Sequence, residues 1–161
     1  MTMILDGSAG VTFPNSTVQA SSGVVLQVVN ATYATQTTNS TTTYADTGIT
    51  ATITPKFSTS KILVLINIGE AQKTAANANN DMSINLVRNG TQIVQLTQEA
   101  LLTGTAIALN MPLSLQYYDS PASTSALTYK CQFKNNDNNG ASVQVQVSSV
   151  ASTITLMEIA Q

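Results

Sequence analysis

Hydrophobic and polar residues alternate in short runs from residue 24 onwards, and the runs end at turn-forming residues. The clearest run is 82–88 (MSINLVR), in which apolar residues occupy every second position at its start, and Asn89 and Gly90 follow it. A period of two places apolar side chains on one face of a strand. Asn-Gly supplies the positive φ angles of a two-residue hairpin turn. The pattern therefore predicts a hairpin whose second strand is 92–96 (QIVQL).

Further segments have the β-branched, partly alternating composition of short strands. Residues 61–68 (KILVLINI) are apolar at nearly every position, which is typical of a strand covered on both faces. Pro112 cannot donate a ladder hydrogen bond, so its segment is predicted to be an edge strand or to contain a bulge. The predicted strands outside the hairpin are 24–33, 50–54, 61–70, 108–119, 126–133, 141–147 and 152–160.

Eight or so short strands joined by turns indicate an all-β fold, an antiparallel sandwich or a jelly roll. Helix-forming residues gather only in 70–81 and 98–106, which are short and lie where loops between strands are expected. No fixed internal period is present, which disfavours a propeller or a solenoid. We therefore expect one jelly-roll sandwich domain over residues 24–161.

Residues 1–23 differ from the rest of the chain. They contain one charged residue, three glycines, a proline and isolated large apolar residues, without the basic region and continuous apolar stretch of a cleaved signal peptide. We predict that 1–23 is an extended N-terminal arm that anchors the domain on a partner, because each spaced apolar side chain can fill a shallow pocket. The predicted anchoring residues are Leu5, Asp6, Gly7, Val11, Phe13 and Pro14.

Charge and hydropathy exclude two classes of partner. The chain has six basic and eight acidic residues, a net charge of −2, and its basic residues are scattered. A nucleic-acid grip needs clustered lysines and arginines, so none is expected. The longest apolar run, 62–66 (ILVLI), is far shorter than the roughly 20 residues of a spanning helix, so no membrane insertion is expected.

Catalytic and metal-binding patterns are also missing from the sequence. The chain has no histidine, the commonest general base and metal ligand, which excludes Ser–His–Asp and Cys–His catalysis. Most carboxylates stand beside turn-forming residues and are expected to be solvated loop charges. Residues 135–140 (NNDNNG) lack the alternating acidic positions and closing glutamate of a calcium loop and predict a hairpin turn. We expect no enzyme activity, no cofactor and no bound metal, and we expect Cys131 to be a small core residue.

The chain has too few charged residues to keep unpaired strand edges from aggregating. Assembly into a closed oligomer would cover these edges, and it is therefore predicted. The doubly apolar strand 61–68 fits this prediction, with one face in the core and the other on a neighbouring subunit. The alternative is a strand central to one sheet and covered by a loop of the same chain. The predicted subunit interface consists of Ile62, Val64, Ile66, Tyr117 and Tyr118.

Four segments together resemble one group of proteins. They are 5–19 (LDGSAGVTFPNSTVQ), 53–68 (ITPKFSTSKILVLINI), 117–133 (YYDSPASTSALTYKCQF) and 152–160 (STITLMEIA). Their combination and order are similar to virion proteins of bacteriophages, especially phages of cyanobacteria and marine bacteria. The chain departs from the family at Asn15-Ser16, where Asp-Gly is common, and at Cys131, where an aliphatic residue is usual. The resemblance implies a trimeric jelly roll; relatives are commonly labelled tail fibre or structural protein.

The resemblance leaves two placements on the virion surface open. In the first, the chain is a capsid decoration (cement) protein whose homotrimer docks through its arm on the major capsid protein or another virion protein. In the second, it is a short tail fibre or receptor-binding tip that attaches to a host surface glycan or protein through loops 34–47 and 70–81. The arm, which spans at most about 80 Å when extended, favours the first placement. The lack of tryptophan disfavours a glycan platform.

Overall fold

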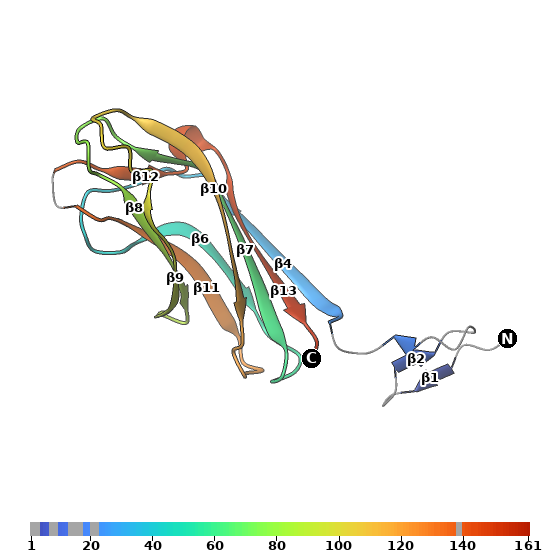
Figure 1. Cartoon of the computed structure of the whole chain (residues 1–161). Helices are drawn as coiled ribbons and strands as arrows, with labels where there is room; N and C mark the ends of the chain where they lie inside the picture. The colour runs from blue at the N-terminus through green and yellow to red at the C-terminus, as the bar shows by residue number, and fades with distance from the viewer. Residues whose placement is uncertain (1–3, 7–9, 13–17, 20–22, 138–139) are drawn as a thin grey trace.

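The computed structural model describes residues 23–137 and 140–161 in full, and the backbone of 4–6, 10–12 and 18–19 (Figure 1). The described residues form antiparallel strands and one short 3-10 turn, η1 (Val147–Ser149), and they include no α-helix. The prediction of an all-β antiparallel sandwich is therefore confirmed, as is the absence of helices from the described 70–81 and 98–106.

The first sheet is built around β7. β10 pairs along one edge of β7, and β13 and β12 pair along the other edge. β4 then pairs with β13, and β5 pairs with β12. The strands of this six-stranded sheet are β4 (Val25–Tyr33), β5 (Thr37–Asn39), β7 (Lys61–Lys73), β10 (Leu109–Asp119), β12 (Val143–Val145) and β13 (Ser152–Ile159).

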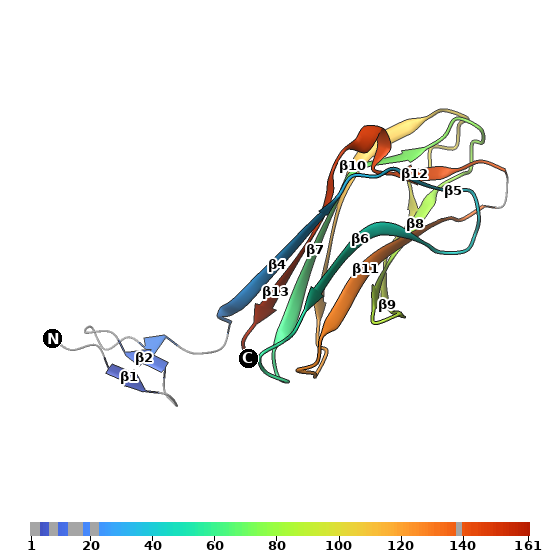
Figure 2. The same ribbon diagram turned by 180° about the vertical axis from the view of Figure 1, so that it is seen from behind.

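The second sheet has four strands in the order β6-β11-β8-β9. It lies face to face with the first sheet, and Figures 1 and 2 show the two layers from opposite sides. Eight of the described strands have seven residues or more. Along the chain, successive strands of this length alternate between the two sheets, except at the β8–β9 hairpin, whose two strands belong to the same sheet. The strands of the four-stranded sheet are β6 (Ala45–Ile53), β8 (Met82–Arg88), β9 (Thr91–Ala100) and β11 (Leu127–Asn135).

Local turn chemistry and strand positions follow the sequence predictions. Asn89 and Gly90 join β8 to β9 with φ angles of 50° and 84°, as an Asn-Gly hairpin requires. β10 forms an edge of the first sheet, and its register shifts between Met111 and Leu113, on either side of Pro112. A proline there removes no ladder bond that the sheet needs.

The inner face of β7 forms the centre of the core. Ile62, Val64 and Ile66 are almost completely buried in one cluster with residues of the second sheet. They were predicted to contact a neighbouring subunit, and this prediction is wrong, because they already pack inside their own chain. The error arose because 61–68 is apolar on both faces, so its composition does not say which face turns inward. The outward apolar residues of this segment are Leu63 and Leu65, which are half-buried.

β6 begins at Ala45, earlier than its predicted bounds of 50–54. The prediction missed this part of the strand because polar residues in it also point into the sandwich. Thr47 is buried, and its Oγ1 donates to the Cys131 carbonyl at 2.9 Å, which satisfies the hydroxyl inside the core. Gly48 has a φ of 87°, and a Cβ there would lie 2.1 Å from the ring of Tyr33. Glycine therefore allows the ring to pack directly on the β6 backbone.

The N-terminal backbone differs from the single extended arm that was expected. β1 (Ile4–Asp6), β2 (Gly10–Thr12) and β3 (Val18–Gln19) form a separate antiparallel sheet in the order β1-β2-β3. Pairing gives their backbone N–H and C=O groups partners that a lone extended segment would lack. The chain enters the sandwich at Gly23, whose N–H donates to the Ala160 carbonyl at 2.7 Å.

Several charged side chains are buried, contrary to the expectation that the carboxylates are mostly solvated loop charges. Asp81, Asp119, Glu158 and Lys73 are all less than a tenth exposed. Each has hydrogen-bond partners that compensate for the loss of water. The composition indicated few charges, but it did not indicate that several of these charges connect parts of the fold internally.

Lys73 connects two loop segments at one end of the sandwich. Its ammonium group donates to the Ala78 carbonyl at 2.9 Å, the Thr103 hydroxyl at 2.6 Å and the Thr105 carbonyl at 3.2 Å. Three oxygen acceptors use the three donors of a lysine ammonium. The segments after β7 and before β10 are therefore held together through one side chain.

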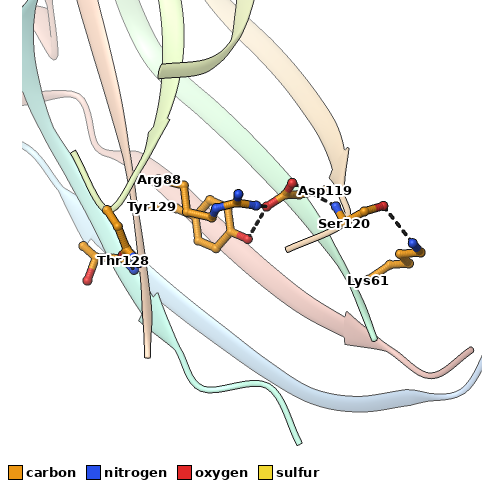
Figure 3. A network of polar contacts seen from close by, with 7 residues as sticks. Lys61, Arg88, Asp119, Ser120, Thr128 and Tyr129 are labelled. Carbon is orange, nitrogen blue, oxygen red and sulfur yellow. Dashed lines mark hydrogen bonds and ion pairs between the residues drawn. The ribbon is translucent and has the colours of Figure 1, made fainter. Parts of the chain in front are cut away.

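Asp119 links the two sheets (Figure 3). Its Oδ2 accepts hydrogen bonds from Arg88 Nη1 on β8 and from Tyr129 Oη on β11, the latter at 2.6 Å. Its Oδ1 accepts the Ser120 N–H at 2.8 Å. Burial, together with the bond to Asp119, raises the pKa of Tyr129, so the phenol remains a donor. The end of β10 is thus fastened to the opposite sheet.

Replacing Asp119 by alanine should lower the free energy of unfolding by about 2–4 kcal/mol, because Arg88 and the Tyr129 hydroxyl would lose a shared, largely buried acceptor. Urea denaturation followed by circular dichroism measures this change. Asp46→Ala is the matched control, because it removes the exposed ion pair of Asp46 with Lys130. The control should cost no more than about 1 kcal/mol. Equal losses for the two variants would contradict the structural role of Asp119.

Glu158 fastens the opposite edge of the first sheet. Its Oε2 accepts from Gln27 Nε2 at 2.6 Å, and its Oε1 accepts the Lys56 N–H at 2.7 Å. The pKa of Glu158 is lower than its ordinary value. Burial alone would raise the pKa, but these hydrogen bonds, together with one from the Phe57 N–H, stabilise the carboxylate and outweigh the effect of burial. The carboxylate therefore holds the loop after β6 against β4 and β13.

Glu158→Gln should lower the free energy of unfolding by about 1–3 kcal/mol at neutral pH. Because the folded-state pKa is below the ordinary value of 4.5, the carboxylate stabilises the fold above that value. This stabilisation is lost as the pH falls through the folded-state pKa, so the difference between the two proteins should shrink in acid. Urea titrations from about pH 7 to pH 3 test this. A constant difference over that range would be inconsistent with the proposed linkage.

Candidate interaction surface

A row of large apolar side chains crosses the outer face of the first sheet. Register places Met157 of β13 between Val28 of β4 and Leu63 of β7, and Leu63 beside Tyr118 of β10. Val28 and Tyr118 are 53% and 50% exposed, and the other two are half-buried. We call these four residues the apolar row. Large apolar side chains lined up on a solvent-facing sheet are typical of a surface that contacts another molecule.

The apolar row extends towards the point where the N-terminal segment joins the sandwich. Val25 pairs with Ile159 at the start of β4, and Val25 is 46% exposed. Gly23 and Val24 continue this ladder by pairing with Ala160. Gly23, where the described sandwich begins, and the β4 end of the apolar row therefore belong to one continuous stretch of chain.

A polar hollow lies next to the apolar row on the same face. It has a volume of about 330 Å³ and lies over the middle of β7, β10 and β13. Its side chains are almost all uncharged amides and hydroxyls around an apolar floor at Leu65. The outward residues that line it are Leu65, Asn67, Ser114, Gln116, Thr153 and Thr155.

The described part of this face is electrically neutral between its two ends. Lys61 lies at one end of β7 and donates to Ser120 Oγ at 2.8 Å. Glu70 lies towards the other end and accepts from Asn110 Nδ2 at 2.6 Å. No charged residue of the four long strands occupies the rows between them, because Asp119 and Glu158 point inward.

The outer face of the second sheet is different. Lys130 pairs with Asp46 at 2.9 Å, and Lys134 lies 5.3 Å from the ring centre of Tyr44. Gln132 also donates to Asp46, at 2.6 Å. Charged and amide side chains therefore keep that face hydrated, whereas the apolar row leaves the first sheet with a less hydrated outer surface.

The predicted site residues are only partly brought together. Tyr118 belongs to the apolar row, whereas Tyr117 points inward and packs against the core. Register pairs Leu5 with Val11 and Asp6 with Gly10 in the N-terminal sheet. The predicted anchoring residues Gly7, Phe13 and Pro14 lie outside the described residues, as do 138 and 139 of the predicted hairpin turn at 135–140.

Sequence reasoning missed Val28, Leu63 and Met157. Leu63 lies in the strand that was predicted to be apolar on both faces, so an alternation count starting from its inner residues would have found it. Val28 and Met157 are 129 positions apart and become neighbours only through the β4–β13 register. No local pattern indicates that pairing.

The described residues contain no group of three or more His, Cys, Asp or Glu side chains placed to hold a metal ion. They also contain no helix long and apolar enough to cross a membrane. Cys131 is completely buried on β11, which confirms the prediction of a core residue. Its burial raises the pKa of the thiol to about 12.

Comparisons with known proteins give distant likenesses. No family model matches the chain, and no curated protein matches it. Among solved structures, the chain is similar to the VP2 subviral particle of infectious bursal disease virus, with 15% identity and a TM-score of 0.43 over 84% of this chain and 38% of that one. It is also similar to dimeric latent PorU from Porphyromonas gingivalis, with 11% identity and a TM-score of 0.38 over 98% of this chain and 14% of that one.

A third similar structure is a family 35 carbohydrate-binding module from an environmental isolate. The identity is 8% and the TM-score 0.30, over 97% of this chain and 84% of that one. The chain spans less than two-fifths of the VP2 and PorU chains. Likenesses at this level assign no activity or partner.

The buried thiol gives a direct test of the packing around β11. Cys131 should not react with 5,5′-dithiobis(2-nitrobenzoate) in the folded protein at neutral pH and should react fully in guanidinium chloride, because the thiolate is disfavoured and access is blocked. The matched control is a Cys131→Ala, Thr52→Cys double variant, whose single thiol is exposed on the second sheet and should react without denaturant. Rapid labelling of native Cys131 would contradict this packing.

Proposed function

We propose that the chain is a bacteriophage structural protein on the virion surface, a capsid decoration protein with a jelly-roll domain. The observation that carries the proposal is the strand order. If the eight long described strands are numbered one to eight along the chain, the first sheet reads 1-8-3-6 and the second reads 2-7-4-5. Two Greek keys wound around one core would have this order, which supports a jelly roll, an architecture used in viral capsid and lectin domains.

The surface features support a docking role. Gly23 precedes the exposed Val25 by two residues and the exposed Val28 by five residues along the chain. A segment and an adjoining apolar surface can engage one partner together, which adds buried area without requiring a deep pocket. The sequence resemblance to phage virion proteins makes the major capsid protein, or another virion protein, the proposed partner.

A homotrimer is proposed for the assembled state. Among the described strands, β4, β5 and β10 are edges of the first sheet, and β6 and β9 are edges of the second. Association of three copies would shield part of these edges and place three N-terminal segments on one shell. Three linked contacts give avidity, and a protein that binds only the assembled shell stabilises it by mass action.

The second candidate is a short tail fibre or receptor-binding tip. It is favoured by the neutral polar hollow next to Tyr118, because an uncharged concave surface beside an exposed aromatic ring suits a host glycan. The segments predicted as exposed tips are partly ordered strand, since β5 and the start of β6 fall within 34–47 and the end of β7 falls within 70–81. In this placement, the N-terminal segment would join a baseplate or a longer fibre.

Copy number distinguishes the two placements. In purified particles of the virus that encodes this chain, quantitative mass spectrometry should find it in amounts comparable to the major capsid protein. A few dozen copies per particle would contradict the decoration role and favour the fibre role.

Light scattering of the purified protein at micromolar concentration should give the mass of a trimer, and a monomer would contradict the trimeric state.

Deletion of residues 1–22 separates docking from folding. The truncated protein should keep the circular dichroism spectrum of the full chain but no longer bind particles stripped of the native protein.

Val28→Asp should weaken particle binding at least about tenfold, because it places a charge in the apolar contact. Thr52→Asp, on the outer face of the second sheet, is the matched control and should bind normally. Unchanged binding by the Val28 variant would rule out docking through the apolar row.

A further inference from the structure

The polar hollow has the dimensions and lining of a small-ligand site. Its volume of about 330 Å³ lies at the lower end of the range found for such sites. It is formed by side chains of three neighbouring strands, β7, β10 and β13, whose ladder bonds fix their spacing. A ligand bound there would contact a rigid sheet rather than a loop.

Hydrogen-bonding groups in the hollow are only partly used by the protein. Ser114 Oγ donates to Asn67 Oδ1 at 3.2 Å, and Asn30 Nδ2 donates to Thr155 Oγ1 at 2.8 Å. Among the described residues, the amide nitrogen of Asn67 and the whole side-chain amide of Gln116 have no protein partner. Each amide presents donors and an acceptor to solvent, which is the combination that pairs of adjacent hydroxyl groups require.

The absence of charge on the side chains that line the hollow indicates the chemical class of ligand that it suits. No lining side chain is ionised, and the charged residues at the ends of the face, Lys61 and Glu70, are already hydrogen-bonded to Ser120 and Asn110. A phosphate, sulfate or carboxylate ligand would find no cation to offset the loss of its water. The hollow therefore suits an uncharged ligand rich in hydroxyl groups.

Apolar contacts are available beside the amides. Leu65 forms part of the floor, and it pairs with Gln116 on one side and Thr155 on the other. Tyr118 lies two residues beyond Gln116 on the same face of β10, about 7 Å away along the strand, and is 50% exposed. The C–H face of a pyranose ring packs on such apolar and aromatic side chains while its hydroxyl groups reach the amides.

We propose that the polar hollow binds a neutral oligosaccharide. One sugar ring lies over Leu65, with hydroxyl groups bonded to Asn67 and Gln116, and the adjoining ring stacks on Tyr118. The proposal concerns the free protein, in which Tyr118 is exposed. It does not require the N-terminal segment or the β4 end of the apolar row.

The test is an amide-resolved NMR titration of the full chain with defined probes. The neutral probes are maltohexaose, cellohexaose, mannohexaose and fully N-acetylated chitohexaose, and the anionic probe is a heparin hexasaccharide, each up to about 10 mM. At least one neutral probe should shift the backbone signals of Leu65, Asn67 and Gln116, and heparin should not. No shift by any neutral probe, or shifts confined to other regions, would overturn the proposal.

Variants then assign the contacts. Gln116→Ala and Asn67→Ala should each weaken binding of the active probe about fivefold to tenfold, the effect of one lost hydrogen bond. Tyr118→Ala should weaken it by at least as much through lost stacking. Gln95→Ala removes another exposed glutamine, from the edge strand of the other sheet, and should bind like the parent protein. Equal affinity of the Gln116, Asn67 and Gln95 variants would overturn the assignment of the site.

The outcome is separable from that of the proposed function. Copy number per particle and binding of the Gln116 variant to stripped particles report on docking alone. Loss of sugar binding with normal particle binding would support the oligosaccharide site and leave the docking role intact. Sugar binding by a protein found in only a few dozen copies per particle would support the site while contradicting the decoration role.

Discussion

The packing of the inner side of β7 against the second sheet is the constraint on which the rest of the structure depends. Ile62, Val64 and Ile66 of β7 pair with residues of β10 and β13, so the direction in which they point also fixes the direction of these partners. A one-residue slip would turn every side chain of a strand to the other face. The apolar row and the polar hollow are therefore consequences of the same register that builds the core.

Buried ionic and amide groups then fasten the edges that the apolar core does not reach. Asp119 joins the end of β10 to the opposite sheet, Glu158 holds the loop after β6, and Lys73 joins two loops at the far end. Each group is surrounded by several hydrogen-bond partners, which limits the cost of burying it. A chain with few charges thus uses several of them as internal connections, while uncharged amides and hydroxyls supply much of the outer surface of the first sheet.

Local sequence signals predicted the strands well, because each depends on neighbouring residues. The Asn89-Gly90 turn, the edge position of Pro112 and the burial of Cys131 all follow from a few positions. The inward face of β7 could not be predicted, since both of its faces are apolar and only long-range packing chooses between them. The neighbourhood of Val28 and Met157 was also hidden, because it depends on a pairing between the two ends of the sandwich domain. The N-terminal sheet was missed because its strands are two or three residues long.

The junction at Gly23 has a mechanical consequence. Any tension on the N-terminal segment enters the sandwich where Gly23 and Val24 pair with Ala160, and it continues along β4, which Figure 1 shows running away from that junction. Force along the strand axis loads the β4–β13 ladder in shear, so its hydrogen bonds resist together instead of opening one after another. β13 passes the load to β7 in the centre of the sheet. A pull on the chain at Gly23 would therefore be resisted by the β4–β13 ladder as a whole.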